Sequence, residues 1–140
     1  MGGGIDGMKT SLTVLSDAEL VERFNALAVE MGFDSKYAET RSYNRRFTSM
    51  AAIEDELFHR GRLGALLPGM RNEDPWIQYF SAAYCRSIAP TESLEVVERL
   101  AKLDTPGSIT YPGSVAGEAR ISLDIIRRGD AVERHRSPRE

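Results

Sequence analysis

Cysteine and histidine are scarce in this chain of 140 residues, which has one cysteine and two histidines. A single cysteine excludes an internal disulfide and any zinc site built from several thiolates. Cys85 has mostly apolar neighbours in the sequence, so we expect a buried, inert thiol rather than a nucleophile. His59 and His135 are too few to form a catalytic or metal-binding set, and we expect no metal and no cofactor.

Long apolar runs are also absent. No segment approaches the roughly 20 apolar residues that a membrane-spanning helix needs, and no signal-peptide pattern opens the chain. We therefore expect a cytoplasmic protein without membrane attachment. The chain has 18 basic and 21 acidic residues, a net charge of −3, which opposes a basic face for nucleic acid.

The sequence signatures of common enzymes are missing as well. No His-Glu-x-x-His, Walker loop or Gly-x-Ser-x-Gly motif occurs. Three early glycines match the spacing of a dinucleotide-binding loop, but that motif requires a strand before it and a helix after it, and the sequence predicts neither here. We therefore interpret residues 1–15 as a flexible leader. His59 would lie beside Glu56 on a helix, yet no third partner is identifiable, and we expect no catalytic residue.

Apolar residues recur three and four places apart through most of the chain, which is the spacing of amphipathic helices. Ser16 and Glu19 form a capping box at the first helix start, while Asp74 and Pro75 suit the start of the fourth. No alternating strand pattern occurs, so the sequence predicts an all-α fold. The six expected helices span about 16–32, 34–60, 63–70, 75–88, 91–103 and 114–128.

The second helix has the most mixed charge. Its predicted buried face consists of Tyr43, Phe47, Met50, Ile53 and Leu57. Its charged residues fall mostly on the other side, namely Arg45, Arg46, Glu54, Asp55 and Glu56. We interpret these charges as a solvated face, whose ion pairs contribute only about 0.2–0.5 kcal/mol each.

Helices three and four, and helices five and six, look like two hairpins that would bury their faces only by stacking. We therefore expect a short right-handed armadillo/HEAT-like helical solenoid over residues 16–130, with the first two helices covering one end. Two Pro-Gly pairs predict an irregular segment around 105–114. Residues 131–140 have almost no apolar content and are expected to form a loose basic tail.

Three stretches carry a family resemblance: YNRRFTSMAAIEDELFHRG at 43–61, ALLPGMRNEDPWIQYFSAAYCRSIAP at 65–90 and GEARISLDIIRRGD at 117–130. Over roughly residues 17–130 the chain resembles the bacterial family catalogued as domain of unknown function 2019. The resemblance implies a small armadillo-like helical domain without an established activity. The chain departs from the family in the SITYPG segment and in the basic tail.

Stacked helix pairs create extended, gently concave surfaces that typically bind proteins or peptides. Aromatic and arginine side chains dominate protein interfaces. We therefore expect a non-enzymatic protein-binding module, either a monomer or a homodimer, with a protein partner. Its candidate contact residues are Trp76, Tyr79, Tyr111, Arg45 and Arg46. For Trp76 the alternative is a core aromatic that closes a hairpin.

Two more specific functions remain open. A small acidic domain could be an immunity protein that neutralises a basic toxin, because complementary charge speeds association. Alternatively, a helical-repeat protein could bind nucleic acid or act like a glycosylase, with Trp76 stacking on a base and Arg86 among the arginines that hold phosphates. The acidic total opposes this alternative.

Overall fold

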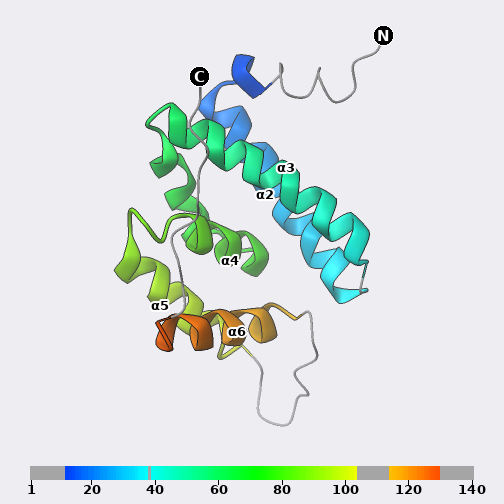
Figure 1. Cartoon of the computed structure of the whole chain (residues 1–140), viewed down its shortest axis with the longest axis vertical. Coiled ribbons are helices and arrows are strands. Elements are labelled where there is room, and N and C mark those ends of the chain that lie inside the picture. Colours follow the sequence, from blue (N-terminus) through cyan, green and yellow to red (C-terminus); the bar gives the residue numbers. More distant parts are fainter. Residues whose placement is uncertain (1–11, 38, 104–113, 130–140) are drawn as a thin grey trace.

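The computed structural model describes residues 12–37, 39–103 and 114–129 (Figure 1). Within these ranges the chain is helical and contains no strand, which confirms the predicted all-α class. A helical turn at 12–14 precedes α2 (Asp17–Lys36), α3 (Thr40–His59), the 3-10 helix η1 (Leu63–Arg71), α4 (Pro75–Tyr84), α5 (Pro90–Leu100) and α6 (Val115–Arg127). No helix in the described part combines the length and apolar character needed to cross a membrane.

Helices that follow one another pack as α2 with α3, η1 with α4, and α5 with α6. The helix α4 lies centrally, because it also packs on α2, α5 and α6 (Figure 1). Trp76 at the start of α4 contacts Gly32 late in α2, whereas Tyr84 at its end lies 5.7 Å from Phe24, ring centre to ring centre. The helix α4 therefore runs antiparallel to α2 and in the same direction as α3.

The core is one continuous cluster of side chains from every helix. The fully covered members include Leu20, Phe24, Met31, Met50, Leu57, Leu66, Met70 and Leu100. Five of these, Leu20, Phe24, Met31, Met50 and Leu57, continue the apolar spacing of the first two predicted helices. This spacing thus identified the core side of α2 and part of the core side of α3.

Two helix boundaries differ from the prediction. The first helix was expected to stop at Gly32, but α2 continues to Lys36, because Gly32 provides the space that Trp76 fills rather than a stop. The second helix was expected to start near Asp34, but Asp34 lies inside α2 and α3 starts at Thr40. At the end of α3 the predicted stop is confirmed, since Gly61 has φ of 70°, a conformation that favours glycine.

The predicted faces of α3 also need correction. Phe47 was expected in the core, but 43% of its surface is exposed. Glu54 and Glu56 were expected on the solvated side, yet both are buried. The predicted residues Met50, Ile53 and Leu57 are buried. Because both α2 and η1 pack on α3, the buried face is broader than the apolar residues alone indicate.

Three later helices keep their predicted positions with changed details. The segment around Pro68 is a 3-10 helix. Asp74 caps α4 as expected, because its carboxylate accepts from the main-chain N–H of Trp76 at 2.8 Å. However, α4 ends at Tyr84 rather than at 88 as predicted, and Ile88 is exposed. In α5, Leu94 is exposed too.

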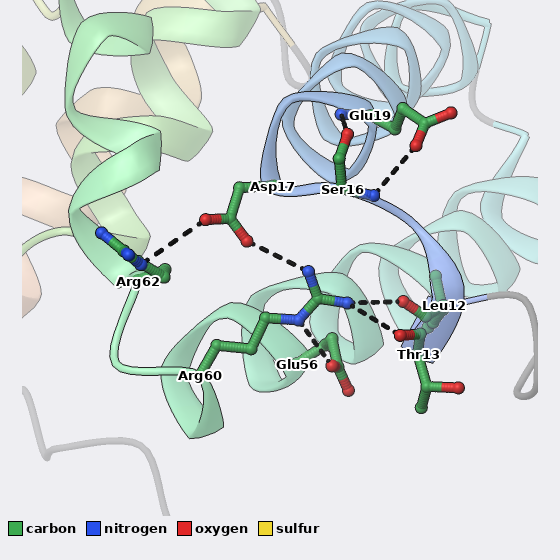
Figure 2. Close-up of polar contacts among 8 residues, drawn as sticks. All are labelled: Leu12, Thr13, Ser16, Asp17, Glu19, Glu56, Arg60 and Arg62. Atoms are coloured by element: carbon green, nitrogen blue, oxygen red, sulfur yellow. Dashed lines mark hydrogen bonds and ion pairs between the residues drawn. The ribbon is translucent and has the colours of Figure 1, made fainter.

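Arg60, just after α3, connects three parts of the chain (Figure 2). Its Nε donates to Glu56 at 2.7 Å, and its Nη1 donates to Asp17 at the start of α2 at 3.0 Å. Its Nη2 donates to the main-chain oxygens of Leu12 and Thr13 at 2.9 and 3.4 Å. Residues 12–15, which the sequence assigned to a flexible leader, are therefore bonded to the helical domain.

The predicted capping box lies beside this cluster and is confirmed (Figure 2). The Ser16 main-chain N–H donates to Glu19 at 2.9 Å, and the Glu19 N–H donates to the Ser16 hydroxyl at 3.1 Å. Asp17, the next residue, also lies 3.7 Å from Arg62. The start of α2 is thus fixed both by its own cap and by arginines from the end of α3.

Candidate interaction surface

Partly exposed side chains on α3, α4 and α6 form a candidate surface, because Phe47 of α3 lies 6.5 Å from the ring of Tyr84 and Tyr79 of α4 is bonded to Ser122 of α6. We call it the α3–α4–α6 face, and it consists of Tyr43, Phe47, Tyr79, Ala83, Glu118 and Ser122. Each helix contributes two residues four apart, which places the two on the same side of that helix. The face therefore extends over one helical turn on each of three helices.

Tyr79 joins α4 to α6. Its hydroxyl lies 2.8 Å from the Ser122 hydroxyl, and its ring meets those of Trp76 and Phe80 edge-on at 6.0 and 5.2 Å. Burial raises the pKa of Tyr79, the Ser122 hydrogen bond partly opposes this, and the charge of Glu118 adds to it. Tyr79 was predicted to be exposed, and this is wrong because the neighbouring rings and α6 cover most of it.

Tyr43 lies in the first turn of α3 and is partly buried against the core. Burial is the largest cause that raises the pKa of Tyr43 to about 12, and the charges of Tyr79 and Glu118 act in the same direction. Neither the Tyr43 hydroxyl nor the Glu118 carboxylate has a hydrogen-bond or ion-pair partner among the described residues.

Phe47 and Ala83 form the apolar part, one turn further along. The ring of Phe47 is half-exposed and lies 6.5 Å from the ring of Tyr84. Ala83, one turn after Tyr79 on α4, is exposed as well. Tyr84 in turn packs on Phe24, so a solvent-facing ring rests directly on the core.

Trp76 is better described by the alternative interpretation, a packing residue. Its indole contacts Gly32 and stacks on Phe80 at 6.0 Å with 25° between the rings. Trp76 is only partly exposed, and its ring meets the ring of Tyr79 edge-on. Trp76 thus positions the face rather than presenting its own ring. Tyr111, another predicted contact residue, lies outside the described residues.

The two predicted arginines are not part of this face. Arg46 donates to both carboxylate oxygens of Asp34, at 2.7 and 2.6 Å, and lies 3.3 Å from Glu30. Its charge is used to join α3 to α2. Arg45 is exposed, but it is two residues from both Tyr43 and Phe47, so it projects from the other side of α3.

Groups suited to catalysis are few in the described part. Cys85 is fully buried, and burial raises the pKa of its thiol to about 12, so the thiolate that a nucleophile needs is disfavoured. His59 lies 3.9 Å from Asp55 on the same helix. Nowhere in residues 12–37, 39–103 and 114–129 do three histidine, cysteine or acidic side chains gather as metal ligands would.

The sequence missed Phe47 and Ala83 as exposed residues. Phe47 was assigned to the core because it continues the apolar spacing of α3. The available signal was its position at the edge of that stripe, next to Thr48. This signal is weak, because only the position of α4 shows which part of the stripe is covered.

Comparisons with known proteins give a family and a fold. The model of the family described as domain of unknown function (DUF2019) matches residues 18–127. A crystal structure of the protein RPA1889 from Rhodopseudomonas palustris is similar over 86% of this chain and 95% of that chain, with 26% identity and a TM-score of 0.70. A search of curated proteins finds no match.

Proposed function

We propose that this chain, which belongs to the family described as domain of unknown function 2019, acts by binding another protein through the α3–α4–α6 face rather than by catalysis. The observation that carries the proposal is the half-exposed ring of Phe47, which lies 6.5 Å from the ring of Tyr84 on a surface that also includes Tyr43 and Tyr79. Aromatic side chains are enriched at protein interfaces because they bury a large area at a low cost in conformational entropy.

The proposal includes the armadillo-like arrangement that the sequence predicts. In such a solenoid the second helix of each pair lines one side. Here these second helices are α3, α4 and α6. Two observations support their common orientation: α4 runs in the same direction as α3, and the hydroxyls of Tyr79 and Ser122 join α4 to α6. The α3–α4–α6 face would then be the concave side of the repeat.

A non-catalytic role is supported by the state of the reactive groups. The Cys85 thiol is covered, and the charges of Arg46 and Arg60 are used in ion pairs that hold helices together. The same ion pairs weaken the nucleic-acid alternative, because phosphate binding needs cations that are free to exchange their counterions. No observation on the described surface favours a glycosylase.

Within this class we propose an immunity protein that binds a basic toxin as the most specific role. Its support is the net charge of −3 together with Glu118 on the face itself. Complementary charge increases the rate of association, which matters for a protein that must capture a toxin quickly. Co-expression with a candidate toxin from a neighbouring gene would test this role, and failure to restore growth with any neighbour would contradict it.

The test of protein binding is site-specific photocrosslinking in the native host. A benzophenone amino acid replaces Phe47, so that an aromatic side chain stays on the face. The matched control has the same residue at Phe33, which is 61% exposed on α2 and stacks on Tyr37 of the same segment. We expect a specific crosslinked protein from position 47 and none from position 33.

Other results of this experiment contradict the proposal. Crosslinks of equal strength from both positions would show non-specific contact, and no crosslink from position 47 would show that the face has no partner. A product of twice the chain's own mass would identify the partner as a second copy. Light scattering across concentrations would then have to show a dimer.

A further inference from the structure

We propose that α6 pairs with α6 of a second copy of this chain, in antiparallel orientation. The contact surface is the outer side of α6, which consists of Glu118, Ile121, Ile125 and Arg128. This inference goes beyond the proposed function, because it concerns a different surface that shares only Glu118 with the α3–α4–α6 face. It commits the chain to a homodimer.

The outer side of α6 has an exposed apolar centre. Ala116, Ala119 and Leu123 are buried and mark the side of α6 that packs on α5 and α4. Ile121 and Ile125 are one turn apart on the opposite side, where 58% and 36% of their surfaces are exposed. Because the two isoleucines adjoin, they form one apolar patch rather than scattered exposure. A second helix can cover such a patch.

The position of α6 allows a second chain to approach. Figure 1 shows α5 and α6 together at one end of the molecule. The other neighbour of α6, the central helix α4, packs on it from the inner side. A symmetric dimer uses the same surface on both chains, so the outer side of α6 must fit a reversed copy of itself.

The charges on the outer side satisfy this condition. In an antiparallel pair, Ile121 of one chain lies opposite Ile125 of the second copy. Three residues before Ile121 is Glu118, and three residues after Ile125 is Arg128. The pairing of the isoleucines therefore also brings Glu118 opposite Arg128 of the second copy, and it does so twice by symmetry. A parallel pair would instead place like charges opposite each other, which opposes association.

Both charged groups can take part in such a pair. The Glu118 carboxylate has no hydrogen-bond or ion-pair partner among the described residues. Arg128 lies 3.2 Å from Asp124 on its own helix, and the side chains are 59% and 67% exposed. A guanidinium has five N–H donors, so Arg128 can keep this contact and also donate to Glu118 of the second copy.

The proposed interface is small. Two isoleucines and two charged residues per chain cover less than the roughly 1,200–2,000 Å² that a stable complex buries. Ion pairs at the edge of such an interface are exposed, so they define the register more than they add affinity. The dimer should therefore be weak, and its population should rise with protein concentration and fall with salt.

Sedimentation equilibrium of the full chain at low salt tests the dimer, over concentrations from about 10 µM to about 1 mM. We expect the mean mass to rise from one chain towards two. Ile121→Lys should weaken association at least about tenfold, because it places a charge in the apolar centre. The matched control is Ile88→Lys, at an isoleucine that is 47% exposed outside the helices, and it should associate as the natural chain does.

An exchange of charges tests the antiparallel register. Glu118→Arg and Arg128→Glu, each alone, should weaken association at least about fivefold, because like charges then meet at both ends of the interface. An equimolar mixture of the two variants should recover the association of the natural chain, since in a mixed dimer both pairs again join opposite charges. Circular dichroism melting checks that every variant folds.

Three outcomes overturn the inference. A mass of one chain at every concentration would show that α6 does not pair. A dimer that Ile121→Lys leaves intact would place the interface elsewhere. Charge variants that associate like the natural chain would reject the antiparallel register. If Arg128→Glu does not fold, the comparison of Ile121→Lys with Ile88→Lys still decides. A crosslink from position 47 to another protein is a separate result, because Phe47 lies on α3.

Discussion

The indole ring of Trp76 lies so close to the Cα of Gly32 that a methyl group on this glycine would overlap it. Gly32 is buried and within α2, so alanine would otherwise favour the helix by about 1 kcal/mol. Overpacking a close contact costs about 1–3 kcal/mol. Because the neighbour is a ring held by Phe80, we expect Gly32→Ala to lower the free energy of unfolding.

Chemical denaturation of Gly32→Ala measures this effect, and Gly64→Ala is the matched control. A methyl group at Gly64 would be 3.7 Å from Leu67, an ordinary contact, and the residue is exposed. We expect this control to change the free energy of unfolding by about 0.5 kcal/mol or less. Equal effects of the two substitutions would contradict the close packing of α2 on α4.

Arg60→Ala should destabilise the chain by about 2 kcal/mol, because it leaves the buried carboxylate of Glu56 without its strongest donor. It also releases the carbonyl groups of residues 12 and 13. The control is Arg71→Ala: the ion pair of Arg71 with Glu92 is on the surface and the arginine side chain is 80% exposed, so we expect about 0–0.5 kcal/mol. Urea unfolding of both variants separates the two expectations.

Phe47→Ala should cost about 1 kcal/mol, because nearly half of the ring is already in water and only the remainder loses its contacts. This is a smaller effect than a core position for Phe47 would give. Leu57→Ala, at a fully covered core position, should cost about 2–5 kcal/mol. The diagnostic result is a Phe47→Ala chain that folds and no longer binds its partner. A loss of stability equal to that of Leu57→Ala would place Phe47 in the core.

Tyr43 gives the folded chain a specific sensitivity to alkali. Its pKa rises from 10.0 to about 12, so between these pH values the unfolded chain has lost a proton that the folded chain keeps. The stabilisation is therefore complete below pH 10 and falls as the pH rises towards 12, by at most about 1.4 kcal/mol per pH unit for one group. Tyr43→Phe should make this loss less steep. An unchanged slope in urea titrations at each pH would contradict the burial of Tyr43.

Cys85 should not react with thiol reagents while the chain is folded. Its side chain is fully covered, and burial raises the pKa of the thiol from 9.0 to about 12. The labelling rate should therefore follow the fraction of unfolded chain, and it should rise in Gly32→Ala and Arg60→Ala in proportion to their loss of stability. Rapid labelling at neutral pH without denaturant would show that the thiol is accessible.

Features that depend on neighbouring residues could be predicted from the sequence. The capping box at Ser16, the cap at Asp74 and the stop at Gly61 each involve contacts or conformations within a few residues. Apolar spacing likewise located the core side of α2, since Leu20 and Phe24 are fully covered. The all-α class follows from these local signals.

Features that depend on distant partners could not be predicted in the same way. A glycine after an apolar stripe usually marks the end of a helix. Gly32 instead lies within α2, where its missing side chain makes room for the ring of Trp76 from α4. The sequence predicts that Glu56 lies on the surface. In the structure it is buried, because Arg60 donates a hydrogen bond to it and α2 packs on α3. The candidate site is of this second kind, because Tyr79 and Ser122 come within hydrogen-bond distance only after α4 and α6 have packed together.

The bonds from Arg60 to residues 12 and 13 also decide how the chain responds to mechanical tension. A pull on the N-terminal side of residue 12 would be transmitted through the guanidinium to the last turn of α3, before it reaches the first turn of α2. The α2–α3 pair would therefore be loaded as a unit at the end opposite the connection between Lys36 and Thr40, and α2 would not peel away from its own start.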